Sequence, residues 1–197
     1  MHRKPLAIGI LTVVVAVFAV VAAAVATGAE DRPKPIESFT CFAAQMERGA
    51  AGVIDINIFR WSTDEEREML LTTLQEFGRD KLIDTLMKIR PVVGYMRTPN
   101  SIGYDLYYAR NNVQPDGNRH VVMATNRRVA IREAQSAQRS MQYQLTVIEL
   151  QLDQNGKGEG KMVPAAKISW DAKKKAIEIE NYRALPVDLI NVQAKKP

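Results

Sequence analysis

Alternating apolar and polar positions dominate the chain beyond residue 37 and predict a protein built mainly of β-strands. Ile54, Ile56 and Ile58 alternate with Asp55 and Asn57, which is the period-2 pattern of a strand with one buried face. The same pattern, bounded by glycine, proline and asparagine turns, predicts strands over these ranges: 38–45, 53–61, 92–97, 102–110, 119–126, 142–153, 161–171, 175–182 and 187–193.

One stretch, 62–90, breaks the alternation and has helical spacing instead. Two residue pairs can form a capping box at its start: Ser62 with Glu65, and Thr63 with Glu66. Gly78 is expected to end a first helix or to kink a longer one. The apolar stripes are Leu70, Leu74 and Phe77 before this glycine, and Leu82, Ile83, Leu86 and Met87 after it.

Short strands joined by turns, with one helical insert, predict a mainly β fold (β-rich α+β). We expect an antiparallel sandwich or barrel of roughly seven to nine strands, with a helical pair inserted after the second strand. No internal repeat interrupts this pattern. The range 38–197 is therefore expected to form a single domain.

The first 29 residues predict export from the cytoplasm. Arg3 and Lys4 precede Leu6–Ala26, a run without any charge. A short positive segment followed by such a run is typical of a signal peptide, and the run is also long enough for an uncleaved membrane anchor. Residues 30–37 are charged and proline-rich, as in an extended linker. Either alternative places the domain outside the cytoplasm: periplasmic, secreted, or anchored to the inner membrane through residues 6–26 alone.

Composition narrows the classes of partner. The net charge of the chain is +5, with 46% hydrophobic and 25% charged residues, which is ordinary for a globular protein. Arg3 and Lys4 belong to the leader, so the remaining charge is too small for a nucleic-acid-binding face.

Cys41 is the single cysteine, and no intrachain disulfide can form. We expect it to be buried in a strand; a reactive thiol and an intermolecular bridge are the alternatives.

Several segments resemble a family of exported bacterial proteins that has no assigned function. The similar segments are Gly103–Arg110, Pro115–Arg127, Thr146–Met162 and Glu180–Val192. The resemblance implies export. It implies no activity, no cofactor and no catalytic residue.

Aromatic and basic side chains gather in the middle of the chain and form a candidate ligand-binding set: Tyr95, Arg97, Tyr104, Tyr108 and Arg110. Tyrosines interleaved with arginines can stack on sugars or bases, or bind anions. Strict alternation would place Tyr104 and Tyr108 on one face of a single strand. The alternative is a half-buried strand without a ligand.

A basic stretch provides a candidate partner-binding set: Arg127, Arg128 and Arg132. In an exported protein, such residues can contact anionic envelope components such as lipid headgroups or acidic glycans. A solvated surface is the alternative.

Catalytic and metal-binding patterns are weak. The segment Asp153–Gly160 begins like a calcium loop, but its twelfth position is Pro164 instead of a glutamate. His120 is the one histidine beyond the leader, which is a poor start for a zinc site or a nucleophilic site. We therefore assign no catalytic residue, no metal and no cofactor.

Paired carboxylates stay open as a hydrolase alternative. Four acids lie on or near predicted strands: Asp55, Asp105, Glu133 and Glu149. Two of them would have to meet in one cleft. The leading hypothesis is a non-catalytic domain that binds a small ligand or an unknown envelope component, with a scaffold protein as the runner-up. A solid interior without a concave surface near Tyr104 or Tyr108 would remove the ligand version.

Overall fold

The computed structural model describes residues 32–44, 52–98, 103–126, 145–181 and 186–196. Backbone contacts divide the chain into Met1–Pro33 and Lys34–Pro197, and every described strand and helix belongs to the second unit. The export segment 1–29 and the basic set Arg127, Arg128 and Arg132 lie outside the described residues. Within the described ranges, no helix has both the length and the hydropathy needed to span a bilayer.

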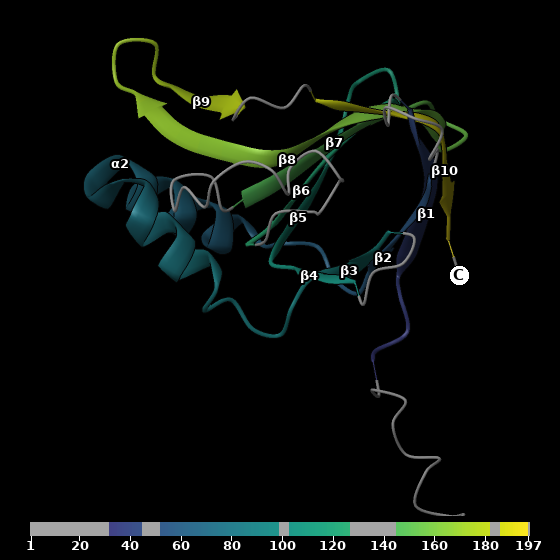
Figure 1. Cartoon of the computed structure of the whole chain (residues 1–197), viewed down its shortest axis with the longest axis horizontal. Coiled ribbons are helices and arrows are strands. Elements are labelled where there is room, and N and C mark those ends of the chain that lie inside the picture. Colours follow the sequence, from purple (N-terminus) through teal and green to yellow (C-terminus); the bar gives the residue numbers. More distant parts are fainter. Residues whose placement is uncertain (1–31, 45–51, 99–102, 127–144, 182–185, 197) are drawn as a thin grey trace, which may run out of the picture. The chain divides into compact units, whose positions relative to one another are not determined.

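Within the described residues, ten strands form one antiparallel sheet, which confirms the mainly β prediction (Figure 1). The order is β4-β3-β2-β1-β10-β8-β7-β6-β5, with β9 paired to β8. The strands are β1 (Glu37–Ala44), β2 (Gly52–Ile58), β3 (Gly94–Arg97), β4 (Tyr104–Leu106), β5 (Tyr108–Val113), β6 (Arg119–Thr125), β7 (Leu145–Leu152), β8 (Lys157–Asp171), β9 (Ala176–Asn181) and β10 (Val187–Lys195).

The sheet curls so that one face of most strands encloses a hydrophobic interior. Along most of these strands, alternate residues point inward, as the period of two requires. The fully buried interior positions include Phe39, Ile54, Ile56, Ile58, Met123, Ile148, Leu150 and Leu189. Among the described residues the edge strands β4 and β5 share no ladder, so this is an open, curled sheet and not a closed barrel.

The predicted strand 102–110 is two strands in the structure, which is why the sheet has more strands than expected. β4 pairs with β3, whereas β5 pairs with β6 at the other edge of the sheet. The chain crosses the gap between the two edges at Tyr107, whose N–H donates to the carbonyl of Ala124 at 3.0 Å. An apolar run that changes edge looks the same in sequence as one continuous strand. The expected alternation therefore stops at this residue.

Helix α2 (Asp64–Leu86) is the predicted helical insert after the second strand. Its capping box is the pair Thr63 and Glu66, with hydrogen bonds of 3.2 and 3.0 Å. Gly78 has φ 77° and divides the helix into two segments, 64–77 and 79–86. Phe77 is 67% exposed, so its place in the predicted apolar stripe is wrong. The break at Gly78 interrupts the helical phase directly beyond this side chain.

Strand β7 is buried on both faces over its first half. Ile148, Leu150 and Leu152 point into the curled interior. Leu145 and Val147 point outward and belong to a second core cluster, together with Leu70, Leu74, Leu82, Ile83 and Leu86 of α2. The helix therefore covers an apolar area on the outer face of the sheet, and this arrangement creates the candidate site.

A buried ion pair crosses the interior between strands that are not neighbours. Arg119 of β6 donates two hydrogen bonds to the carboxylate of Glu37 of β1, at 2.7 and 2.8 Å. The side chains are 12% and 5% exposed. Arg119 Nε also donates to Asn111 at 3.1 Å. Because the pair is bidentate and shielded from water, each charge depends on the other.

Replacing Glu37 by leucine is expected to destabilise the fold by about 3–5 kcal/mol, because it leaves the Arg119 charge buried without its carboxylate. Urea unfolding of the purified domain measures this. The matched control is Glu178→Leu, which breaks the exposed pair with Lys174 and should cost less than about 1 kcal/mol. Equal losses of unfolding free energy in the two variants would contradict the assignment of Glu37 and Arg119 as a buried ion pair in which each charge depends on the other.

Candidate ligand-binding site

A concave, largely apolar groove of about 400 Å³ lies between α2 and the outer face of β5–β9. The helix contributes Leu70, Leu71, Leu74, Leu82 and Leu86. The sheet contributes Val122, Ala124, Leu145, Val147 and Ile168. Figure 1 shows α2 beside this part of the sheet, below the β8–β9 hairpin. Pockets that hold small molecules have volumes of about 300–1,000 Å³ and a mainly apolar lining, as this groove does.

The start of α2 is fastened to the edge strand β5 by Ser62. The N–H of Ser62 donates to the carbonyl of Ala109 at 2.7 Å, and the N–H of Ala109 donates to the Ser62 hydroxyl at 3.1 Å. Ser62 is buried. These two bonds satisfy backbone groups of an edge strand and place the helix beside the outer face of the sheet.

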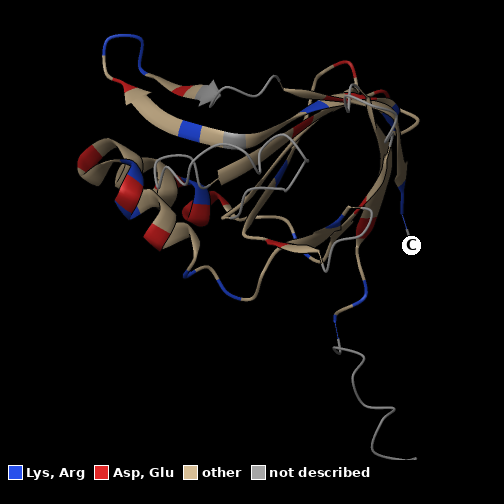
Figure 2. Ribbon diagram, in the orientation of Figure 1, with Lys and Arg blue, Asp and Glu red and all other residues tan. Residues whose placement is uncertain are grey.

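A second anchor joins the helix to the loop before β3. Arg60 donates two hydrogen bonds to Glu66, at 2.9 and 2.8 Å, and two more to the carbonyl of Pro91. The pKa of Glu66 is lowered, chiefly because its carboxylate accepts hydrogen bonds from Arg60. The first turn of α2 is thus held from two directions. Acidic and basic residues both occur along α2 (Figure 2), and Arg67 is one of them that lines the groove.

The outer face of the sheet changes from apolar to polar over a short distance along the strands. Residues that pair across neighbouring strands form rows on this face, and the change occurs within two rows. The strand register aligns Tyr108, Ala124 and Val147 in the apolar row. The next row on this face contains Arg110, Val122, Glu149 and Lys161. The third contains Asn112, His120, Gln151 and Glu159. The groove therefore has an apolar body and one polar end, where β5 meets the helix.

The β8–β9 hairpin forms the opposite, apolar end of the groove. Ile168 pairs with Ile179 across the two strands, and Trp170 pairs with Ile177. Ile177 and Ile179 line the groove, yet they are 51% and 48% exposed. Large aliphatic side chains that stay half-exposed in a concave site leave apolar surface for a ligand to cover.

The polar end of the groove contains Arg67, Tyr108, Arg110 and Asn112. Arg110 Nη1 donates to Asp64 at 2.7 Å, and its Nε donates to Asn112 at 3.1 Å. The pKa of the Tyr108 hydroxyl is raised, mainly by burial; the nearby Arg110 and Arg67 act in the opposite direction. This end combines a partly dehydrated hydroxyl with two guanidinium groups.

The structure separates the predicted ligand-binding set. Tyr108 and Arg110 lie in the groove. Tyr104 packs against the interior core, on the other face of the sheet. Tyr95 and Arg97 lie on the outer side of β3, and a Cβ at Gly103 would come within 1.9 Å of the Tyr95 hydroxyl. The break at Tyr107 explains why Tyr104 and Tyr108 do not share a face.

Sequence reasoning missed most of the groove, including the helix leucines and the β9 isoleucines. One signal was present in the run Leu145–Leu152. Three of its first four residues are apolar, namely Leu145, Val147 and Ile148, and they fall on both faces of a strand. A strand that is apolar on both faces must be covered on both faces, which indicates a helix or a second layer outside the sheet.

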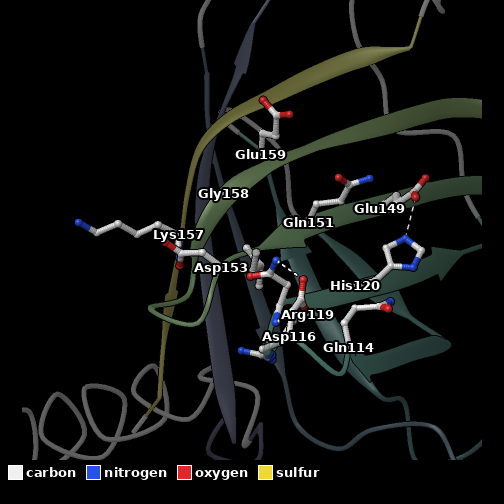
Figure 3. Close-up of a pocket in the computed structure, with 12 residues that line it drawn as sticks. Gln114, Asp116, Arg119, His120, Glu149, Gln151, Asp153, Lys157, Gly158 and Glu159 are labelled. Atoms are coloured by element: carbon white, nitrogen blue, oxygen red, sulfur yellow. Dashed lines mark hydrogen bonds and ion pairs between the residues drawn. The ribbon is translucent and has the colours of Figure 1, made fainter.

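A second, polar concavity of about 620 Å³ occupies the other half of the same outer face (Figure 3). His120 and Glu149 point toward each other, with Nε2 and Oε1 2.6 Å apart. Asp153 accepts backbone hydrogen bonds from Asn155 and Lys157, at 2.8 Å each, and so closes the β7–β8 turn. These side chains already form hydrogen bonds with one another or within the turn, and the concavity is open to solvent. It is a weaker candidate than the groove.

The acids named for the hydrolase alternative do not meet in the described part of the chain. Asp55 accepts a hydrogen bond from Thr40 on the outer face of β2, and Glu149 of β7 contacts His120. Asp105 is exposed on β4. These three acids line no common cleft, and Glu133 lies outside the described residues. No group of three or more potential metal ligands occurs in the described ranges either.

Cys41 and His120 lie on opposite faces of the sheet, so a Cys–His nucleophilic site does not form. Cys41 is fully buried in the interior core, as its sequence context predicted, whereas His120 is on the outer face. Burial, followed by the charge of Asp55, raises the pKa of Cys41 from 9.0 to about 12.

Comparison with known proteins adds no assignment. No protein-family model, no curated protein and no solved structure matches the chain. The candidate site therefore depends on geometry and chemistry alone.

The Cys41 thiol of the native protein is expected to resist an aromatic disulfide reagent. At about pH 8, a pKa of about 12 lowers the thiolate fraction about a thousandfold relative to an ordinary thiol. Labelling should become fast only in denaturant. Rapid labelling of the native protein would contradict the assignment of Cys41 as buried.

Above pH 9.0 the thiol of the unfolded chain ionises while the buried thiol of the folded chain stays protonated, so the free energy of unfolding should fall as the pH rises.

Proposed function

We propose that this protein is an exported, non-catalytic binding module, and that its ligand is a small, mainly apolar molecule held in the groove between α2 and the sheet. The observation that supports this most directly is the groove itself, about 400 Å³ in volume and lined by leucine, isoleucine and valine. Concave sites of this size and lining are typical of small-molecule binding.

The half-exposed groove residues favour a ligand over a purely structural role. A helix that served only to cover the sheet would be expected to leave little concave apolar surface. Here, Ile177 and Ile179 stay about half-exposed at one end. A ligand along this surface would exclude water from both α2 and β9.

Burial of a hydrocarbon chain in the groove would by itself give weak binding. Each buried methylene contributes about 0.8 kcal/mol, so ten methylenes contribute about 8 kcal/mol. Association costs at least about 4 kcal/mol in lost translational and rotational freedom. An apolar body alone would therefore bind with a Kd no tighter than about 1 mM, and tighter binding requires contributions from the polar end.

Export is the second part of the proposal, and it is supported by the N-terminal sequence. Arg3 and Lys4 precede the uncharged run Leu6–Ala26, as in a signal peptide or membrane anchor. The domain would then act in the periplasm, outside the cell, or on the outer side of the inner membrane. The scaffold alternative relied on Arg127, Arg128 and Arg132, and no observation on the described residues favours it.

Replacing Val122 by tryptophan is expected to weaken ligand binding at least about tenfold, because the indole would fill the groove floor between α2 and β6. The probe is N-phenyl-1-naphthylamine, a neutral apolar dye whose fluorescence rises on transfer from water to an apolar site. The dye should bind the wild-type domain and give a saturable titration.

Val53→Trp is the matched control, since Val53 is a 40%-exposed valine on the outer face of β2, away from the groove. This variant should keep the wild-type affinity. If the wild-type domain failed to bind the dye, or if both tryptophan variants bound it equally well, the groove would lose its proposed role.

A further inference from the structure

We infer that the ligand of this groove is a single-chain amphiphile with a small anionic head, whose head is bound by Arg110 and Arg67 while its hydrocarbon tail extends toward Ile177 and Ile179. The inference rests on the proposed function, because it names the class of ligand for the same groove. It follows from the polarity of the lining and from the hydrogen bonds of Arg110.

The groove lining is polar at one end only. Arg67, Arg110 and Asn112 are at the end where the helix starts beside β5. From there, the floor continues through Val122, Ala124 and Val147 toward the β8–β9 hairpin, with no charged residue among the described lining beyond the two arginines. A ligand of matching shape has one polar end and one long apolar part.

Arg110 has donor capacity left for a ligand. Its Nη1 and Nε donate to Asp64 and Asn112, and its Nη2 has no acceptor among the described residues. The side chain is 28% exposed, so it is only partly hydrated. A guanidinium in this state matches a carboxylate or phosphate oxygen at the mouth of an apolar site.

Two carboxylates compete for the arginines, but both are weakly held. Asp64 is 79% exposed while its partner Arg110 is 28% exposed. Glu68 is 62% exposed and pairs with Arg67, which is 45% exposed. Exposed ion pairs contribute little to stability, so an anionic head can share the guanidinium groups or displace these carboxylates toward solvent.

The test is displacement of N-phenyl-1-naphthylamine by decanoate and by methyl decanoate, which have the same chain and differ in the charge of the head. Decanoate should displace the dye from the wild-type domain at a concentration at least about tenfold lower than methyl decanoate does. Acetate and inorganic phosphate should not displace it, because they lack the tail.

Arg110→Gln should remove the preference for decanoate over the ester, measured within this variant as the ratio of the two displacing concentrations. Asp64→Asn breaks the same ion pair but should increase the preference, because it removes the competing carboxylate. If Arg110 only positioned the helix through its ion pair with Asp64, Arg110→Gln and Asp64→Asn would change the affinities for decanoate and its ester in the same direction. Asp64→Asn also keeps the test available should Arg110→Gln fold poorly.

The outcomes separate the two proposals. If the dye does not bind the wild-type domain, the groove is not a ligand site, and both proposals fail. If the dye binds but decanoate and its ester displace it equally, the anionic head is excluded while the groove stands. Displacement by acetate or phosphate as strong as by decanoate, or a preference that survives Arg110→Gln, would equally overturn the assignment of the amphiphile.

Discussion

Burial of both faces of one region of the sheet is the constraint on which the rest of the structure depends. Leu145 and Val147 point outward from β7, while Ile148 and Leu150 point into the curled interior. Because the interior is filled by side chains of the sheet itself, the outward pair needs a separate cover. Helix α2 supplies this cover, and the paired backbone bonds of Ser62 with Ala109 hold its start in place.

The cover is incomplete, and the groove is the result. Gly78 divides α2 into two segments, so the helix cannot follow the outer face as one straight rod. The β8–β9 hairpin extends beyond the region paired with β7 and adds an apolar wall whose isoleucines stay half-exposed. The aliphatic side chains of the interior, by contrast, are fully buried. The proposed ligand site therefore lies on the outer face of this sheet.

The mainly β class, the helical insert and the Thr63–Glu66 cap could be predicted because each depends on local spacing. Tyr108 and Arg110 could be identified as candidates because tyrosines and arginines are interleaved in this part of the sequence. Their separation from Tyr104 could not be predicted, since the change of sheet edge at Tyr107 is a non-local event. The β9 isoleucines have the pattern of an ordinary strand, and only the pairing with β8 places them in the groove.

Methyl NMR of the full domain, with N-phenyl-1-naphthylamine added stepwise, tests the assignment of the groove as the ligand site most directly. We expect shifts confined to groove methyls such as those of Leu74, Val147 and Ile177, with the interior methyls of Ile54 and Ile148 unchanged. Shifts that instead follow the polar concavity around His120, or that spread through the interior core, would contradict this assignment.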